Sequence, residues 1–170
     1  MIGLDALNAL DRAAFVRELG AVFEHSPWVA DGAWARRPFA SVEALHRAMC
    51  EVVAGAGDEA QLALIRAHPQ LAGRAAVRGE LTDASRREQG GAGLDQCTPE
   101  EFAQLHVLND AYERRFGFPF ILAVRGHTRA TILASMALRL DNEPATERAE
   151  ALRQIERIAM FRLVDLVKHP

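Results

Sequence analysis

Cysteine is scarce in this chain: Cys50 and Cys97 are the only two among 170 residues, and no Cys-x-x-Cys spacing occurs. This predicts neither a disulfide framework nor a structural zinc site. No apolar run approaches the roughly 20 residues that cross a bilayer. The first residues do not have the basic-then-apolar pattern of a secretory signal, and the last three are not a peroxisomal signal. We expect a cytoplasmic protein with no membrane partner.

An excess of positive charge is absent as well. The chain has 20 Lys and Arg residues against 23 Asp and Glu residues, which gives a net charge of −3. A phosphate backbone would find little electrostatic attraction here, so we expect no nucleic-acid partner. Hydrophobic residues make up 49% of the chain and charged residues 25%, which is ordinary for a globular protein. We expect a single domain over residues 1–170, which buries roughly 70% of its extended-chain surface.

Several catalytic motifs are also missing. The sequence has no G-x-S-x-G nucleophile elbow, no phosphate-binding P-loop and no H-E-x-x-H zinc motif. Its six histidines show no spacing typical of a metal site supported by carboxylates. The sequence therefore gives no support for these hydrolase, nucleotide-dependent and zinc-dependent classes, and we expect no metal.

Most of the chain has the three- and four-residue spacing of apolar residues that is typical of helices, and no convincing strand pattern. Helices are predicted over 5–23 (with a break at Asn8 or Asp11), 41–54, 59–68, 82–90, 98–115, 128–140 and 144–167. The predicted fold is all-α, a single compact bundle of about seven to eight helices.

His68 stands at the predicted end of one helix, because Pro69 cannot continue it. Leu64 and Ile65, four and three residues earlier, share its apolar face. The carbonyl end of a helix favours a protonated imidazole, which is a reasonable place for a proton donor. A half-buried histidine that only bonds a carbonyl is the alternative.

A second polar group is predicted on one helix face, where Ser85, Glu88 and Gln89 have i, i+3 and i+4 spacing. Alternatively, Ser85-x-x-Glu88 is a capping box in a solvated helix. Between 117 and 126, Gly117 and Pro119 prevent a regular helix, so backbone groups of an apolar segment need partners from a ligand or from the protein itself.

Arg162 falls on the apolar face of the last predicted helix. An unpaired buried charge is costly, so we expect this guanidinium to meet an internal carboxylate or a bound anion.

Three blocks of sequence resemble one known family. They are His68-Pro69-x-Leu71-Ala72-Gly73, Ser85-x-x-Glu88-Gln89-x-x-Ala92-Gly93-Leu94, and Asn109-x-x-Tyr112-x-x-Arg115-Phe116-Gly117-Phe118-Pro119-Phe120-Ile121. In this order and at these separations they resemble the decarboxylases of 2-oxo-4-hydroxy-4-carboxy-5-ureidoimidazoline (OHCU). The segment Glu24-x-Ser26-Pro27-Trp28 and the helix that carries Arg162 are similar too.

The resemblance implies an all-helical, cofactor-free carboxy-lyase of purine metabolism that converts OHCU, a product of urate oxidation, into (S)-allantoin. It implies His68 and Glu88 as catalytic residues. The substrate-binding residues that it implies are Pro69, Ser85, Glu88, Gln89, Phe120, Ile121, Leu122, Ala123, Val124 and Arg162. Arg162 either contacts an anionic part of the substrate or orients Glu88. Family members are commonly dimers, so the resemblance also suggests a homodimer.

Two other functions remain open from the sequence. One is a helical binding module that keeps the pocket without catalysis, and the other is a hydrolase of an earlier urate-oxidation intermediate. For the binding module, a His68→Ala variant should leave ligand affinity and biological output intact. For the hydrolase, the chirality of the product separates it from a stereospecific decarboxylase.

Overall fold

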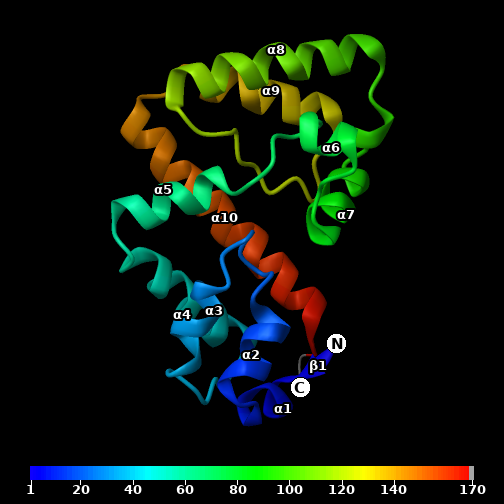
Figure 1. The fold of residues 1–170 in the computed structure, drawn as a ribbon. Helices are drawn as coiled ribbons and strands as arrows, with labels where there is room; N and C mark the ends of the chain where they lie inside the picture. The colour runs from blue at the N-terminus through cyan, green and yellow to red at the C-terminus, as the bar shows by residue number, and fades with distance from the viewer. Residues whose placement is uncertain (169–170) are drawn as a thin grey trace. The chain divides into compact units, whose positions relative to one another are not determined.

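The computed structural model describes residues 1–168 and is built almost entirely of helices (Figure 1). The all-α prediction is confirmed. The part of the chain that the structure describes contains ten α-helices, three more than the segments predicted. The difference has two sources: the break in the predicted segment 5–23 separates α1 (Leu4–Ala9) from the helix that follows, and α3 (Trp28–Trp34) and α6 (Arg74–Arg78) are short helices that were not predicted. The described chain divides into two compact units, one made of residues 1–67 with 155–168 and the other of residues 68–154.

The first unit joins the two ends of the chain. Besides α1 and α3, it contains β1 (Ile2–Gly3), α2 (Arg12–Leu19), α4 (Val42–Ala54), α5 (Asp58–Arg66), the last turns of α10 (Pro144–Leu166) and β2 (Val167–Lys168). The two short strands pair in parallel, with Ile2 opposite Val167. The sequence did not predict these strands, because two residues are too few to show an alternating pattern.

Local capping signals set several helix boundaries in this unit. The side chain of Asp11 accepts a hydrogen bond from Ala14 N–H at 2.8 Å, so α2 begins at Arg12, and the predicted break at Asp11 is confirmed. Ser41 caps α4 in the same way through Ala44 N–H. α5 ends at Arg66, two residues earlier than predicted, so His68 follows the helix and is not part of it.

The second unit contains α6, α7 (Asp83–Gly91), the 3₁₀ turn η1 (Leu94–Gln96), α8 (Pro99–Phe116), α9 (Arg129–Arg139) and the first turns of α10. α8 and α9 lie side by side (Figure 1). α8 begins with a capping box between Thr98 and Glu101, with Pro99 at the first helical position. Aromatic side chains fill the core beneath α8, where the ring of Tyr112 lies 5.3 Å from that of Phe120.

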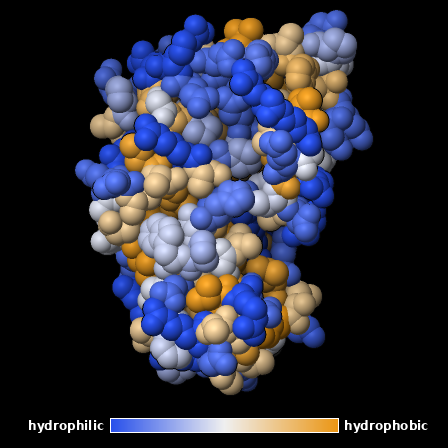
Figure 2. Space-filling view, in the orientation of Figure 1, coloured by the Kyte–Doolittle hydropathy of each residue, from blue (hydrophilic) through white to orange (hydrophobic). Residues whose placement is uncertain are grey.

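The visible surface is mostly hydrophilic. Figure 2 shows apolar residues in scattered groups separated by polar and charged ones. Among the residues that the structure describes, no helix is both long enough and apolar enough to cross a membrane.

Candidate active site

The turn that follows His68 is tied to two helices of the same unit. Ala72 N–H donates a hydrogen bond to Oε1 of Gln89 on α7 at 2.9 Å, and Nε2 of Gln89 donates to the Gln70 carbonyl at 3.4 Å. Nδ2 of Asn109 on α8 donates to the Leu71 carbonyl at 2.9 Å. His68 itself is 7% exposed. The imidazole is therefore removed from bulk water, and the backbone after it is fixed from two sides.

The turn has an unusual backbone that explains its residues. Leu71 is buried, and Ala72 has a φ of +50°, a region that non-glycine residues rarely occupy. A Cβ atom on Gly73 would lie 2.6 Å from Cβ of Gln70, so only glycine fits at this close approach. In this part of the motif, Leu71 packs in the core, Ala72 has a strained backbone, and Gly73 is required because a side chain would clash.

α7 presents the predicted polar face. Ser85 and Gln89 are buried at 4% and 5% exposure, and Glu88, which lies between them on the helix, is half-buried. The oxygen of Thr82 accepts a hydrogen bond from Ser85 N–H at 3.2 Å, so Thr82 caps this helix. The alternative in which Ser85 caps a solvated helix is therefore wrong, because Ser85 lies inside the helix on its buried side.

The segment between α8 and α9 is irregular, as predicted from Gly117 and Pro119, and residues 118–124 are buried. One edge of it is bound by the protein. Nη1 of Arg139 donates to the Ile121 carbonyl at 2.6 Å, and Ala123 N–H donates to Oε1 of Gln154 at 3.0 Å. Side chains of α9 and α10 therefore supply partners for some of the backbone groups of this segment.

The opposite edge of the same segment, at Phe120 and Leu122, lacks hydrogen-bond partners from the described residues of the protein. In an extended chain, alternate residues direct their backbone groups to opposite edges. Ile121 and Ala123 face Arg139 and Gln154. Within residues 1–168, no protein group forms a hydrogen bond with the backbone N–H or C=O of Phe120 or Leu122, although both residues are buried. Buried backbone groups are nearly always paired, so this edge is suited to binding a polar ligand.

A buried network of charged and polar side chains, centred on Arg139 and Glu147, supports the segment at residues 118–124. Nε of Arg139 donates to Oε1 of Glu147 at 2.6 Å, and the Arg139 guanidinium stacks 4.4 Å from the ring centroid of Phe120. Tyr112 Oη also donates to Glu147, and Asn142 Nδ2 does so at 2.9 Å. Burial, together with the hydrogen bond to Glu147, raises the pKa of Tyr112 above its usual value. The sequence analysis missed this network because its members are far apart in the sequence and belong to no shared motif.

Arg162 lies in the first unit, where its Nη1 pairs with Oε2 of Glu24 at 2.8 Å and also reaches the Val22 carbonyl at 3.3 Å. Both side chains of the pair are buried. The expected internal carboxylate partner is thus found, in the Glu24-x-Ser26-Pro27-Trp28 segment that contributes to the family resemblance.

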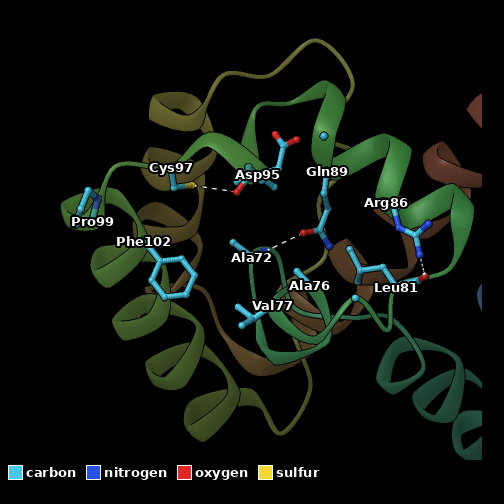
Figure 3. Close-up of a pocket in the computed structure, with 13 residues that line it drawn as sticks. Ala72, Ala76, Val77, Leu81, Arg86, Gln89, Asp95, Cys97, Pro99 and Phe102 are labelled. Atoms are coloured by element: carbon cyan, nitrogen blue, oxygen red, sulfur yellow. Dashed lines mark hydrogen bonds between the residues drawn. The ribbon is translucent and has the colours of Figure 1, made fainter.

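A cavity of about 510 Å³ adjoins the turn in the second unit (Figure 3). The bonded pair Ala72 and Gln89 forms part of its wall, and Ala76, Leu81 and Phe102 make much of the rest apolar. Its lining does not include His68, Pro69, Ser85, Glu88 or residues 120–124. Of the predicted site residues, Gln89 alone lines this space. Among the residues described, no three His, Cys, Asp or Glu side chains gather as a metal site requires.

Comparison with known sequences identifies the family. A sequence model of the OHCU decarboxylase family matches residues 8–164. The chain belongs to this family. It is 43% identical over 162 residues to the 2-oxo-4-hydroxy-4-carboxy-5-ureidoimidazoline decarboxylase of Haloferax volcanii, which covers 95% of this chain and 94% of that protein. The predicted family membership is confirmed.

Two further relatives are longer than this chain. It is 43% identical over 167 residues to the uric acid degradation bifunctional protein PucL of Bacillus subtilis, covering 98% of the chain but 33% of that protein. A crystal structure of (S)-allantoin synthase matches with a TM-score of 0.78 at 29% identity, covering 98% of this chain and 54% of the other. The chain therefore spans about a third of the length of the first of these two proteins and about half of the length of the second.

Proposed function

We propose that this chain decarboxylates OHCU and protonates the product on one face, which yields (S)-allantoin in the degradation of urate. The observation that carries the proposal is the family match over residues 8–164, which includes the buried His68, the polar face of α7 and the unpaired backbone edge at 120–122. The activities named for the bacterial and archaeal relatives agree with it.

The reaction needs one well-placed proton. The bond between the ring carbon and the carboxylate carbon breaks, carbon dioxide leaves, and the electron pair delocalises into the ring. A protonated His68 then gives its proton to that carbon and becomes neutral, and water later restores the proton. An imidazole has a pKa suited to this transfer near neutral pH. Because His68 is 7% exposed, the imidazole gives its proton away from bulk water.

Glu88 is the second proposed catalytic residue. Its half-buried carboxylate lies on the helix face that also carries the buried Ser85 and Gln89. A carboxylate there accepts hydrogen bonds from the hydroxyl and ureido groups of the substrate. Ser85 adds a hydroxyl contact. Gln89 already bonds the turn through Oε1, so its second amide hydrogen is the group that we assign to the substrate.

Residues 120–124 are proposed to recognise the ring. A cyclic amide offers an N–H donor next to a carbonyl acceptor, which complements the paired N–H and C=O groups of an extended chain. The unpaired edge at Phe120 and Leu122 supplies such groups, while Ile121 and Ala123 face the supporting side chains. Pro69 adds an apolar contact. Arg162, paired with Glu24, is proposed either to contact an anionic group of the substrate or to orient Glu88.

The test uses freshly generated OHCU and follows circular dichroism of the product. The wild-type protein should produce one allantoin enantiomer well above the spontaneous rate. His68→Asn should lower kcat by about 10²–10⁴-fold, the usual contribution of general acid catalysis. Racemic product at the spontaneous rate, from a folded wild-type protein, would overturn the proposal. Consumption of an earlier urate-oxidation intermediate in place of OHCU would point to a hydrolase instead.

Three broader properties are also proposed. The family match runs across both compact units, which supports one functional domain over the chain. Large exposed apolar side chains at Val77, Val107 and Leu138 are consistent with a homodimer, which light scattering will test. A cytoplasmic location, with neither nucleic acid nor membrane as a partner, remains the expectation from composition.

A further inference from the structure

Asn109 lies in the middle of α8 and is 3% exposed. Its carboxamide reaches across to the turn that begins at His68, where Nδ2 bonds the Leu71 carbonyl at 2.9 Å. The next peptide group, Ala72 N–H, is held by Gln89 from α7. Amide side chains from two different helices therefore form hydrogen bonds with consecutive residues of one turn, Leu71 and Ala72. These residues lie three and four positions after His68, the proposed proton donor.

The turn requires such support because its backbone is strained. Ala72 has a φ of +50°, and residues in this region persist only when surrounding contacts hold them there. Pro69 restricts its own φ but not the residues that follow. If either tether is lost, the turn can relax toward an ordinary conformation and carry His68 with it.

Stability alone does not explain why position 109 is an asparagine. Its Oδ1 is buried and has no hydrogen-bond partner among residues 1–168. A buried amide oxygen without a partner costs free energy, which offsets the gain from the Nδ2 bond. An apolar side chain of similar size would avoid that cost. What the carboxamide supplies and an apolar residue cannot is a directional bond that fixes the Leu71 carbonyl.

We propose that Asn109 is a positioning residue, which holds the His68 turn so that the imidazole delivers its proton to one face of the intermediate. The proposal rests on the function proposed above. Its consequence is specific: without the Asn109 bond the protein should still bind substrate, but His68 should be misplaced. Misplacement of a catalytic group by about 1 Å can cost on the order of 100-fold in rate.

The experiment compares Asn109→Leu and Asn109→Asp with the wild type in kcat, KM and enantiomeric excess of allantoin. Both variants remove the Nδ2 donor. We expect kcat to fall roughly 10–100-fold, KM to change less than about threefold, and the enantiomeric excess to drop measurably. Enzyme concentrations are raised until total rates match, so that spontaneous racemic product contributes equally to every sample.

Asn8→Asp is the matched control. Nδ2 of Asn8 also bonds a backbone carbonyl, that of Phe39, at 2.9 Å, and its Oδ1 accepts from Phe39 N–H. Asn8→Asp loses the same kind of bond in the first unit, so it should be destabilised while keeping the wild-type enantiomeric excess. Gln89→Leu also releases Ala72 N–H, so it should lower kcat and the enantiomeric excess in the same direction, while KM rises as well because Gln89 is a proposed substrate contact. It keeps the test available if an Asn109 variant does not fold.

The outcomes are distinguishable. If Asn109 and Gln89 variants keep the wild-type kcat and enantiomeric excess, the positioning role is wrong while the decarboxylase function stands. If Asn8→Asp loses enantiomeric excess to the same degree, general destabilisation explains the effect and the positioning role is again wrong. If the wild type itself forms racemic product, the proposed function fails first.

Discussion

Replacing Arg139 with methionine removes several interactions of one buried guanidinium. Arg139 neutralises Glu147, donates to the Ile121 carbonyl and stacks on Phe120. The side chains of Arg139 and Glu147 are 8% and 0% exposed. Removing one partner of a buried ion pair typically costs about 3–5 kcal/mol, because the remaining charge is left uncompensated. Since a domain is stable by only about 5–15 kcal/mol, Arg139→Met should lower the denaturation midpoint severely.

A second substitution separates stability from binding. Glu147→Gln added to Arg139→Met removes the buried charge and keeps a side-chain oxygen that can accept the hydrogen bond of Tyr112. We expect this double variant to recover most of the lost free energy of unfolding. It still lacks the donor to the Ile121 carbonyl. A hydrogen bond from a charged donor contributes about 1.5–3 kcal/mol. In the double variant, the backbone at Ile121 should therefore be held less firmly than in the wild type.

The expected kinetic result is a raised KM in the double variant. A loss of about 1.4 kcal/mol of binding corresponds to tenfold, so KM should rise roughly tenfold or more while kcat changes less. Urea denaturation and steady-state kinetics on OHCU measure the two effects. Arg153→Met is the control in the same unit, because Arg153 pairs with Glu150 at the surface and should contribute less than about 1 kcal/mol. A double variant that recovers stability and also keeps the wild-type KM would refute the supporting role of Arg139.

Three further predictions concern single positions. Gly73→Ala places a Cβ atom 2.6 Å from Cβ of Gln70, so it should lower the free energy of unfolding by about 1–3 kcal/mol and reduce kcat, whereas Gly91→Ala has no atom within 4 Å and should do neither. Burial raises the pKa of the Cys50 thiol to about 12, well above its value in an unfolded chain near 8.5. The unfolded chain therefore releases this proton first as pH rises from about 9 toward 12, and ionisation of Cys50 favours unfolding in this range. Cys50→Ala should reduce the pH dependence of unfolding by up to one proton, as measured by denaturation at several pH values. Thr98→Ala removes the N-cap of α8 and should cost about 0.5–2 kcal/mol by thermal or urea denaturation, without a change in KM.

Local chemistry explains which features the sequence could predict. Asp11, Ser41, Thr82 and Thr98 were recognisable as caps because a capping side chain bonds a backbone N–H only two or three residues away. The i, i+3 and i+4 spacing predicted that Ser85, Glu88 and Gln89 share one face of α7, and the structure shows that Ser85 and Gln89 on this face are buried. On α8 the structure buries Asn109.

Other features depend on contacts between distant residues. Asn109 and Leu71 are 38 positions apart, and Tyr112 and Glu147 are 35 apart. No spacing rule connects such pairs, because their distance is set by how whole helices pack. Gln89 illustrates the difference: the family resemblance predicts its carboxamide as a substrate contact, and the fold shows that this group bonds the turn after His68.

The sequence by itself determined the helical class, most of the helix starts, the family and the identity of the candidate site residues, since all of these reside in local patterns or in short motifs. Tertiary structure alone decided that the turn after His68 is gripped by Gln89 and Asn109. It also decided that one edge of the 120–124 segment is supported by Arg139 and Gln154, and that Arg162 is paired with Glu24. The physical reason is that a directional bond between distant residues exists only after packing has brought the two groups within about 3 Å.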